Sequence, residues 1–316
     1  MYKIYVKILS MVLITVFGGA FIYIFIYAKS YPIPLFHRMS LDAKMMFIRD
    51  MTHKENIDTI IIGSSIGLNN IQGIILEESS INVKHVLNMS AFGMEVTHIE
   101  QTWELISLFP NVKRIIYPAQ SLDFTGSSIF EKYDFDFIKG YTDLNKESID
   151  FKYSFYAYKN FIQCVERRWV WQEKYMPNNT FAYLGFDRTG SAPLHIYGRD
   201  IIKKRWDNPY VTTPNEESYL ALERIVKTAN KDGMMFYFVI QPYRGPLVKK
   251  YKSLHSLLTS FNDKTQKIVL GNGGEFLNLH NKLHLSDDYF ADRTHLNDKG
   301  SAITAQEIAL FINENE

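Results

Sequence analysis

The sequence has a single cysteine, Cys164, among its 316 residues. One thiol excludes an intrachain disulfide, a zinc site built from several cysteines and an iron–sulfur cluster. A surplus of charge is also absent, because 35 Lys and Arg residues are balanced by 34 Asp and Glu residues. A nucleic-acid-binding protein needs a basic face to meet phosphates, so this balance argues against a nucleic-acid partner.

Long hydrophobic runs are scarce too, with one exception near the N-terminus. Residues 8–28, ILSMVLITVFGGAFIYIFIYA, form 21 residues without a charge. At about 1.5 Å per residue, a helix of this length matches a hydrocarbon core of roughly 30 Å. Tyrosines near both ends of the run are typical of interfacial anchors. The sequence therefore predicts a single-pass transmembrane anchor over residues 1–28, in contact with the bilayer through 8–28.

A cleaved signal peptide is the alternative for this segment, with Ala28-Lys29-Ser30 as a small-x-small cleavage site. The apolar run is longer than the usual signal-peptide core of about 7–15 residues, which favours an uncleaved anchor. Lysines stand before the run, and lysines and arginines follow it. The positive-inside count therefore leaves open on which side of the membrane the rest of the chain lies.

Beyond the anchor, short β-rich apolar runs alternate with longer amphipathic stretches. This alternation predicts an α/β fold with three α/β/α layers, flavodoxin-like, around a mostly parallel five-stranded sheet. The expected strands are 59–63, 83–89, 113–118, 234–242 and 275–279, and the expected helices are 67–79, 95–108, 216–232 and 298–313.

The predicted domains follow from breaks in this rhythm. Residues 29–50, with Pro32 and Pro34, indicate a juxtamembrane linker with a short helix, and 51–316 the main domain. An aromatic-rich insert is expected at about 124–213. Within it, one face of a helix is predicted from residues spaced three or four apart, namely Phe151, Phe155, Tyr158, Ile162, Val165 and Trp169. A packed cap helix is the favoured interpretation, and sugar stacking or contact with the bilayer surface are the alternatives.

Three motifs at predicted strand ends carry chemistry. Ser65, in Gly63-Ser64-Ser65, follows the first strand and precedes a helix, where its hydroxyl is exposed and a developing negative charge is favoured. Asp292 stands three residues before His295, so its carboxylate can hold the far nitrogen of the imidazole. Gly93, after the second strand, lets a backbone N–H approach a substrate. The alternatives are an N-cap serine, a solvated loop and a simple turn.

The order of these motifs resembles the SGNH (GDSL-like) hydrolase superfamily, over about residues 57–124 and 216–312. The resemblance implies that Ser65 is the nucleophile, that Asp292 and His295 are the acid and base, and that Ser65 and Gly93 line an oxyanion hole. G-S-S in place of G-D-S, behind one N-terminal anchor, is most similar to the DltD-type members. That branch acts outside the cytoplasmic membrane on cell-envelope polymers, often beside a membrane-bound O-acyltransferase.

The sequence departs from the superfamily at its third block, which usually supplies an Asn as oxyanion donor. Gln120 is the candidate in its place, and the loss of one donor typically costs about 10²–10³ in rate. Arg244 is expected at the same rim, either binding an anionic substrate group or pairing with an acid. His280 and His284 share a helical spacing, but with no acidic third ligand nearby we expect neither a metal nor a cofactor.

The combined prediction is a membrane-anchored serine acyltransferase or esterase that modifies a cell-envelope polysaccharide or teichoic-type polymer. Its catalytic domain is expected outside the cytoplasmic membrane. One alternative is a non-catalytic subunit on the same scaffold that binds or assembles an acylation complex, which the missing Asn and the large insert favour. Another is an ordinary esterase on the cytoplasmic side, which the undecided charge count leaves open.

Overall fold

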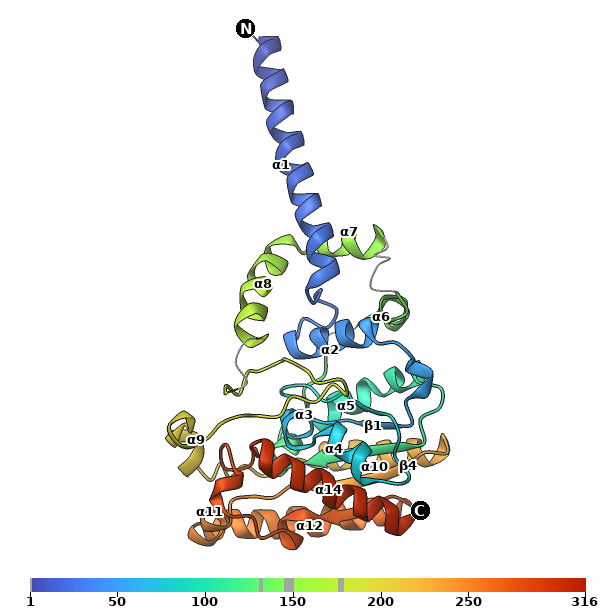
Figure 1. Cartoon of the computed structure of the whole chain (residues 1–316), viewed down its shortest axis with the longest axis vertical. Helices are drawn as coiled ribbons and strands as arrows, with labels where there is room; N and C mark the ends of the chain where they lie inside the picture. Colours follow the sequence, from blue (N-terminus) through green and yellow to red (C-terminus); the bar gives the residue numbers. More distant parts are fainter. Residues whose placement is uncertain (1, 131–132, 145–150, 176–178) are drawn as a thin grey trace. The chain divides into compact units, whose positions relative to one another are not determined.

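The computed structural model describes residues 2–130, 133–144, 151–175 and 179–316. The chain forms two compact units. The first unit combines Met1–Met51 with Tyr133–Glu173, and the second combines Thr52–Lys132 with Lys174–Glu316. The second unit contains the sheet (Figure 1), and every predicted site residue falls within its bounds.

The sheet of the second unit has five strands, all parallel, in the order β2-β1-β3-β4-β5. This is the order of flavodoxin-type folds, and it confirms the predicted fold class. Each strand is close to its expected position, and all but β3, which has the expected length, are shorter than the apolar run that indicated them. The strands are β1 Thr59–Ile61, β2 Val86–Asn88, β3 Arg114–Ala119, β4 Met235–Ile240 and β5 Glu275–Asn278.

Two of the predicted helices are each divided in two. The stretch 67–79 forms α3 Ser65–Asn70 and α4 Gly73–Ser79, because the Asn70 carbonyl accepts a hydrogen bond from the Thr304 hydroxyl at the point where the helix ends. The stretch 95–108 forms α5 Val96–Gln101 and the 3₁₀ helix η2 Trp103–Leu108. The other two predictions correspond to α10 Glu216–Lys231 and α14 Asp298–Asn315.

A long helix that the prediction omitted, α12 Lys252–Gly271, completes the second unit. Its buried residues Leu254, Leu258, Phe261, Thr265 and Val269 repeat every three or four positions, so the signal was present in the sequence. The remaining elements are short: η1 Lys54–Asn56, η3 Ser121–Phe124, η4 Gly198–Asp200, α9 Lys203–Asp207, α11 Gly245–Lys250, α13 Leu279–Lys282 and η5 Asp287–Tyr289.

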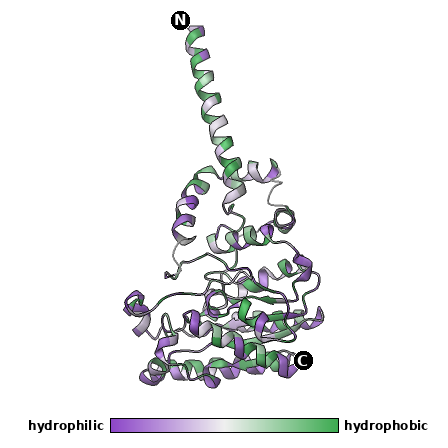
Figure 2. Ribbon diagram, viewed as in Figure 1, coloured by the Kyte–Doolittle hydropathy of each residue, from purple (hydrophilic) through white to green (hydrophobic). Residues whose placement is uncertain are grey.

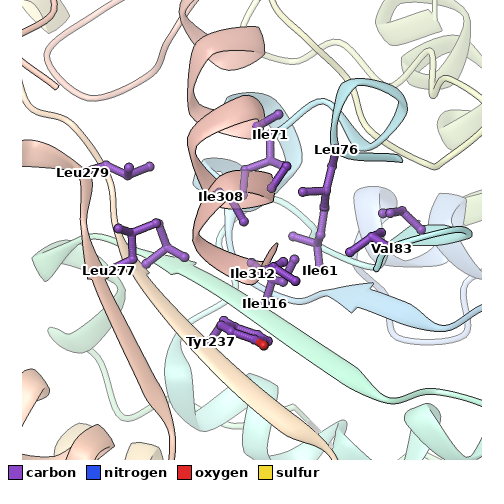
Figure 3. Close-up of a cluster of buried hydrophobic side chains, with 14 residues drawn as sticks. Ile61, Ile71, Leu76, Val83, Ile116, Tyr237, Leu277, Leu279, Ile308 and Ile312 are labelled. Carbon is purple, nitrogen blue, oxygen red and sulfur yellow. The ribbon is translucent and has the colours of Figure 1, made fainter. Parts of the chain in front are cut away.

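Helices cover both faces of the sheet. On one face, Ile308 and Ile312 of α14 pack with Ile61, Ile116 and Tyr237 of three neighbouring strands (Figure 3). On the other face the core is aromatic. There the rings that pack together come from β3, β4, η3 and α12, namely Tyr117, Phe238, Phe124 and Phe261. Because successive side chains of a strand point to opposite faces of the sheet, alternate residues of β3 and β4 supply the two layers.

The first unit is helical. It contains α1 Tyr2–Ser30, α2 Met39–Asp50, α6 Phe135–Thr142, α7 Phe151–Lys159 and α8 Phe161–Tyr175. The buried Asp42 of α2 pairs with Arg167 of α8. Arg49 donates to the Ala28 carbonyl at the end of α1 and to the Tyr141 hydroxyl of α6. These buried charges therefore tie the end of α1 to the other helices of the unit.

The prediction of one packed aromatic helix over the insert is wrong. The helix breaks at Asn160, whose side-chain amide donates to the Tyr156 carbonyl and competes with the helical hydrogen bonds. Phe151, Ile162 and Trp169 of the predicted core face are exposed. The buried positions are others, including Tyr153, Ala157, Cys164 and Trp171.

Helix α1 is long and apolar enough to cross a membrane from Tyr2 to Ala28. Figure 2 shows hydrophobic residues along much of its length. Length and composition fit a membrane anchor and a signal sequence equally, which are the two alternatives that the sequence left open.

The layer between α14 and the sheet generates a stability prediction. Ile308→Ala should lower the free energy of unfolding by about 2–5 kcal/mol, because it leaves a cavity in a fully buried cluster. Leu310→Ala on the same helix is the control, since Leu310 is half exposed and its truncation should change little. Urea denaturation followed by circular dichroism measures both, and equal effects would contradict this packing.

Candidate functional site

Ser65 is the first residue of α3, just after β1. Gly63 stands two residues earlier, and a Cβ at that position would crowd the Pro118 carbonyl of β3 at 3.1 Å, which favours glycine there. The Ser64 hydroxyl accepts a hydrogen bond from the Ile66 N–H at 3.2 Å and caps the helix. The capping alternative therefore applies to Ser64, which leaves the Ser65 hydroxyl available for another partner.

The structure brings Ser65, His295 and Asp292 into one chain of hydrogen bonds. Ser65 Oγ lies 2.9 Å from His295 Nε2, and His295 Nδ1 lies 2.9 Å from Asp292 Oδ2. Because an ionised carboxylate can only accept, Nδ1 donates to Asp292, and in the tautomer with its one proton on Nδ1 the ring offers Nε2 as an acceptor. The Ser65 hydroxyl therefore donates to the imidazole.

The carboxylate of Asp292 is almost fully buried, and it is held by its own loop. Its Oδ1 accepts the N–H groups of Thr294 and His295 at 2.9 and 2.8 Å. Burial by itself would raise the pKa of Asp292. The charge and hydrogen bond of His295 together with these N–H groups outweigh it and lower the pKa to about 2. Asp292 therefore stays ionised while it orients the ring.

Asn70, at the end of α3, holds this loop against the helix that carries Ser65. Its side-chain amide donates to the Thr294 carbonyl at 2.9 Å and accepts the Leu296 N–H at 2.9 Å. Asn70 is fully buried. Sequence reasoning missed this positioning residue, since nothing in the sequence links it to a loop more than 220 residues away.

A second buried carboxyl group, Asp123, lies near the same imidazole and was also missed. It accepts the Gln120 N–H at 3.2 Å and the Gln120 side-chain amide at 3.3 Å. Burial raises the pKa of Asp123 to about 7, although a hydrogen bond from Ser64 and the charge of His295 act in the opposite direction. Two carboxyl groups near one imidazole thus have environments that move their pKa values apart.

The other two predicted oxyanion donors, Gln120 and Gly93, lie directly after β3 and in the turn after β2. Gln120 is buried, and its amide already donates once, to Asp123, which leaves one further N–H on the same nitrogen. Gly93 lies in the turn after β2 with a φ of +68°, a conformation that favours glycine. Both follow strands whose carboxyl ends share an edge with β1, and their role as donors stays a prediction.

Arg244 pairs with an acid, which favours the second of its two predicted interpretations. Its guanidinium makes two hydrogen bonds to Asp287, at 3.0 and 2.7 Å, and one to the Trp206 carbonyl at 2.7 Å. It also stacks on the Trp206 ring, 3.6 Å from the centroid. Arg244 therefore fixes α9, the short helix to which Trp206 belongs.

The residue next to Trp206 reaches the site. Arg205 stacks on the Phe181 ring at 4.3 Å, and its guanidinium lies 4.0 Å from Asp292 Oδ2. The Phe181 ring in turn stands edge-on to His295, with 5.5 Å between the centroids. Arg205 is half exposed, so it presents a cation to solvent beside the imidazole. Neither residue was among the predicted site residues.

His280 is turned toward backbone and aromatic groups. Its Nδ1 accepts the Tyr243 N–H at 3.2 Å, and its ring stands edge-on to the Tyr243 ring. Burial lowers the pKa of His280, and His284 and His255 add to this effect. Within the ranges that the structure describes, no three His, Cys, Asp or Glu side chains are grouped as metal ligands.

This arrangement can perform nucleophilic chemistry. An alcohol, an imidazole and a buried ionised carboxylate in sequence allow the hydroxyl to lose its proton to the imidazole as it attacks an electrophile. The sheet also explains the location, since the carboxyl ends of parallel strands are where ligands bind in such folds.

Comparisons with known proteins identify no family. No family model matches the chain, and no curated protein matches its sequence. A Streptococcus pneumonia structure provisionally named a platelet activating factor is similar at a TM-score of 0.45 and 13% identity, covering 86% of this chain and 92% of that one. A Bacteroides fragilis structure provisionally named an acylhydrolase gives 0.43 and 9%, covering 84% and 90%.

The raised pKa of Asp123 generates a prediction for stability against pH. The folded state binds this proton more tightly than the unfolded chain, so the stability it contributes is complete below about pH 4 and is lost as the pH rises to about 7. The free energy of unfolding of Asp123→Asn, relative to that of the unmodified chain, should therefore be about 3 kcal/mol higher at pH 8 than at pH 5. Urea denaturation at both pH values measures this difference. The exposed Asp143→Asn is the control, and a constant difference for Asp123→Asn would contradict the assignment.

Proposed function

We propose that this protein is a serine-dependent ester hydrolase or acyltransferase. The observation that carries the proposal is the unbroken chain of hydrogen bonds from Ser65 Oγ through His295 to the buried Asp292. A structural serine does not need an imidazole that a carboxylate orients, whereas this arrangement of hydroxyl, base and orienting group is what activates a serine nucleophile. The same chain of bonds favours an enzyme over the non-catalytic binding subunit that the sequence left open.

In the proposed reaction, Ser65 Oγ attacks the acyl carbonyl while His295 Nε2 accepts the hydroxyl proton. Asp292 stabilises the imidazolium that forms. The imidazolium then returns the proton to the departing alcohol, which leaves an acyl ester on Ser65. Water or an acceptor hydroxyl attacks this ester, His295 takes its proton, and Ser65 regains that proton as the acyl group departs.

The negative charge on the tetrahedral carbonyl oxygen needs donors. We assign this role to the backbone N–H groups of Ser65 and Gly93 and to the unused N–H of the Gln120 amide. Asp123 holds the Gln120 side chain by the bonds described above, so it acts as a positioning residue for that donor. Preorganised donors of this kind typically contribute about 10²–10³ each to the rate.

The finer proposal concerns substrate and location. The order of the motifs and the N-terminal apolar helix resemble DltD-type proteins, which supports an O-acylated polysaccharide or teichoic-type polymer of the cell envelope as substrate. We place the second unit outside the cytoplasmic membrane, where a membrane-bound O-acyltransferase is the expected partner. The half-exposed Arg205 beside the imidazole suits a substrate with a negative charge near its ester.

The nucleophile assignment is tested by substitution. Ser65→Ala and His295→Ala should each lower esterase activity by about 10⁴–10⁶ and abolish labelling by a fluorophosphonate probe. Ser64→Ala is the matched control, because it removes the neighbouring hydroxyl and should cost about 1 kcal/mol of capping stability while labelling persists. Labelling that persists in Ser65→Ala would overturn the proposal.

The role of Arg205 is tested with two esters that differ only in charge. Arg205→Gln should raise KM for an anionic aryl ester about tenfold, the effect of one charge-assisted hydrogen bond, and leave kcat nearly unchanged. KM for the neutral ester should not change. Arg199→Gln removes a nearby, fully exposed arginine and is the control. Equal losses on both esters would show that Arg205 acts through Asp292 instead.

A further inference from the structure

Helix α1 consists of a free part and a packed part. From Tyr2 to Gly19 every side chain is exposed, whereas Ile24, Tyr27 and Ala28 are buried inside the first unit. The free part, extended to Ala20, is about 28 Å long, close to the hydrocarbon core of roughly 30 Å. The free part shares residues 8–20 with the predicted span 8–28, and its two lysines, Lys3 and Lys7, lie toward its N-terminal end.

The packed part of α1 contacts aromatic side chains of α7 and α8. The Phe21 ring contacts the rings of Phe151 and Tyr158 of α7, at 5.9 and 6.3 Å between centroids. The Tyr23 ring contacts the Phe161 ring at the start of α8, at 5.8 Å. The corner between α7 and α8 therefore lies beside α1 just where its free part ends.

This corner exposes large apolar side chains. Phe151 and Phe155 of α7 are stacked and exposed, and Ile162 of α8 is 75% exposed. On α1 itself Ile22, Phe25 and Ile26 are exposed, and their spacing places them on the face opposite the buried Ile24, Tyr27 and Ala28. An apolar surface of this kind is typical of contact with a membrane or another protein.

A groove at this corner continues the free surface of α1. It has a volume of about 490 Å³ and is lined by Val16, Phe17 and Ala20 of α1 and by residues 158–163. Residues that we place in lipid thus form one wall of the groove. Because the groove continues the surface of α1, acyl chains that surround a membrane-spanning α1 can also enter the groove.

The charges of α7 match a lipid headgroup. Its sequence, FKYSFYAYK, contains two lysines and no acidic residue. Lys152 lies over the Phe137 and Tyr153 rings, and Lys159 lies over the Phe155 ring at 4.9 Å. Lysines beside aromatic side chains are typical of helices that lie in the interface of anionic membranes, with the apolar face toward the acyl chains.

We propose that the α7–α8 corner is a second membrane contact, lying in the headgroup region at the C-terminal end of the free part of α1. Phe151, Phe155 and Ile162 contact acyl chains, and Lys152 and Lys159 contact lipid phosphates. The proposal rests on α1 being a retained anchor. The structure supports retention, because Ala28 of the small-x-small site is buried and its carbonyl accepts a hydrogen bond from Arg49.

The single cysteine makes a direct test practical. Cys164 is buried, so Cys164→Ser in the full chain removes the only competing thiol. In that background, Ile162→Cys carries an environment-sensitive fluorophore. Ile81→Cys is the matched control, because Ile81 is an isoleucine of the second unit with 73% exposure. Both proteins are reconstituted into vesicles of phosphatidylcholine with phosphatidylglycerol.

The expected result is a blue-shifted emission at position 162, strong quenching by lipids that carry a spin label near the headgroup, and loss of most quenching by iodide. The label at position 81 should emit at the wavelength expected in water, escape quenching by the spin-labelled lipids and be quenched fully by iodide. Equal iodide quenching at both positions would overturn the proposal. Protection of the label at 162 from iodide in native membranes but not in pure lipid vesicles would also overturn the proposal, since a protein partner would then cover the corner.

A further arm separates the lysines from the apolar residues. Lys152→Gln with Lys159→Gln should reduce quenching at position 162 severalfold in vesicles containing phosphatidylglycerol, and have little effect in phosphatidylcholine alone. An equal change in both lipids would contradict the contact with phosphates. Fluorophosphonate labelling of the same preparations reports on Ser65 separately, so failure of the membrane contact and failure of the proposed activity are distinguishable.

Discussion

The hydrogen bonds of one buried amide, that of Asn70, join the two parts of the site. Ser65 and His295 are 230 residues apart, and they come from opposite ends of the second unit's chain. The sheet brings β1 and the loop before α14 to the same edge, but the strands alone do not fix that loop against α3. Asn70 removes that freedom, because it accepts from Leu296 and donates to the Thr294 carbonyl while sitting five residues beyond Ser65 on α3. A nucleophile and its base need this precision, since a misplacement of 1 Å can cost about 10² in rate.

The electrostatics of the site depend on how each carboxyl group is buried. Asp292 and Asp123 both lie out of water, and burial acts to raise the pKa of each. Asp292 receives two backbone N–H groups and a close imidazole, so it remains ionised. The hydrogen bonds from Gln120 to Asp123 are longer, at 3.2 and 3.3 Å, and burial outweighs them and raises the pKa of Asp123 to about 7. The ionised partner stabilises charge on His295, while the other group holds the Gln120 amide in place. Two chemically identical side chains thereby acquire two different tasks.

In the first unit buried charges fasten the helices together, and the aromatic residues divide between buried rings, such as Tyr141 and Tyr153, and exposed ones. Asp42, Arg49 and Arg167 are buried and paired, whereas several large rings of α7 and α8 are exposed. Exposing rings to water is unfavourable, but the proposed contact with lipid removes that cost. The same contact explains why the apolar residues of the insert do not form the packed core face that their spacing predicts.

The sequence by itself determined the fold class, because strands buried on both faces and alternating with amphipathic helices favour a parallel sheet covered by those helices. It also singled out Ser65, Asp292 and His295, since the motifs G-S-S and D-x-x-H encode local geometry that depends on a few adjacent residues. It could not place Asn70, Asp123 or Arg205, whose contacts with the site come from residues distant in the chain. Nor could it show that Arg244 pairs with Asp287, or that the helix predicted within the insert is divided at Asn160 and that several of its aromatic side chains are exposed. Those outcomes depend on which surfaces meet once the chain is folded, and only the tertiary structure decided them.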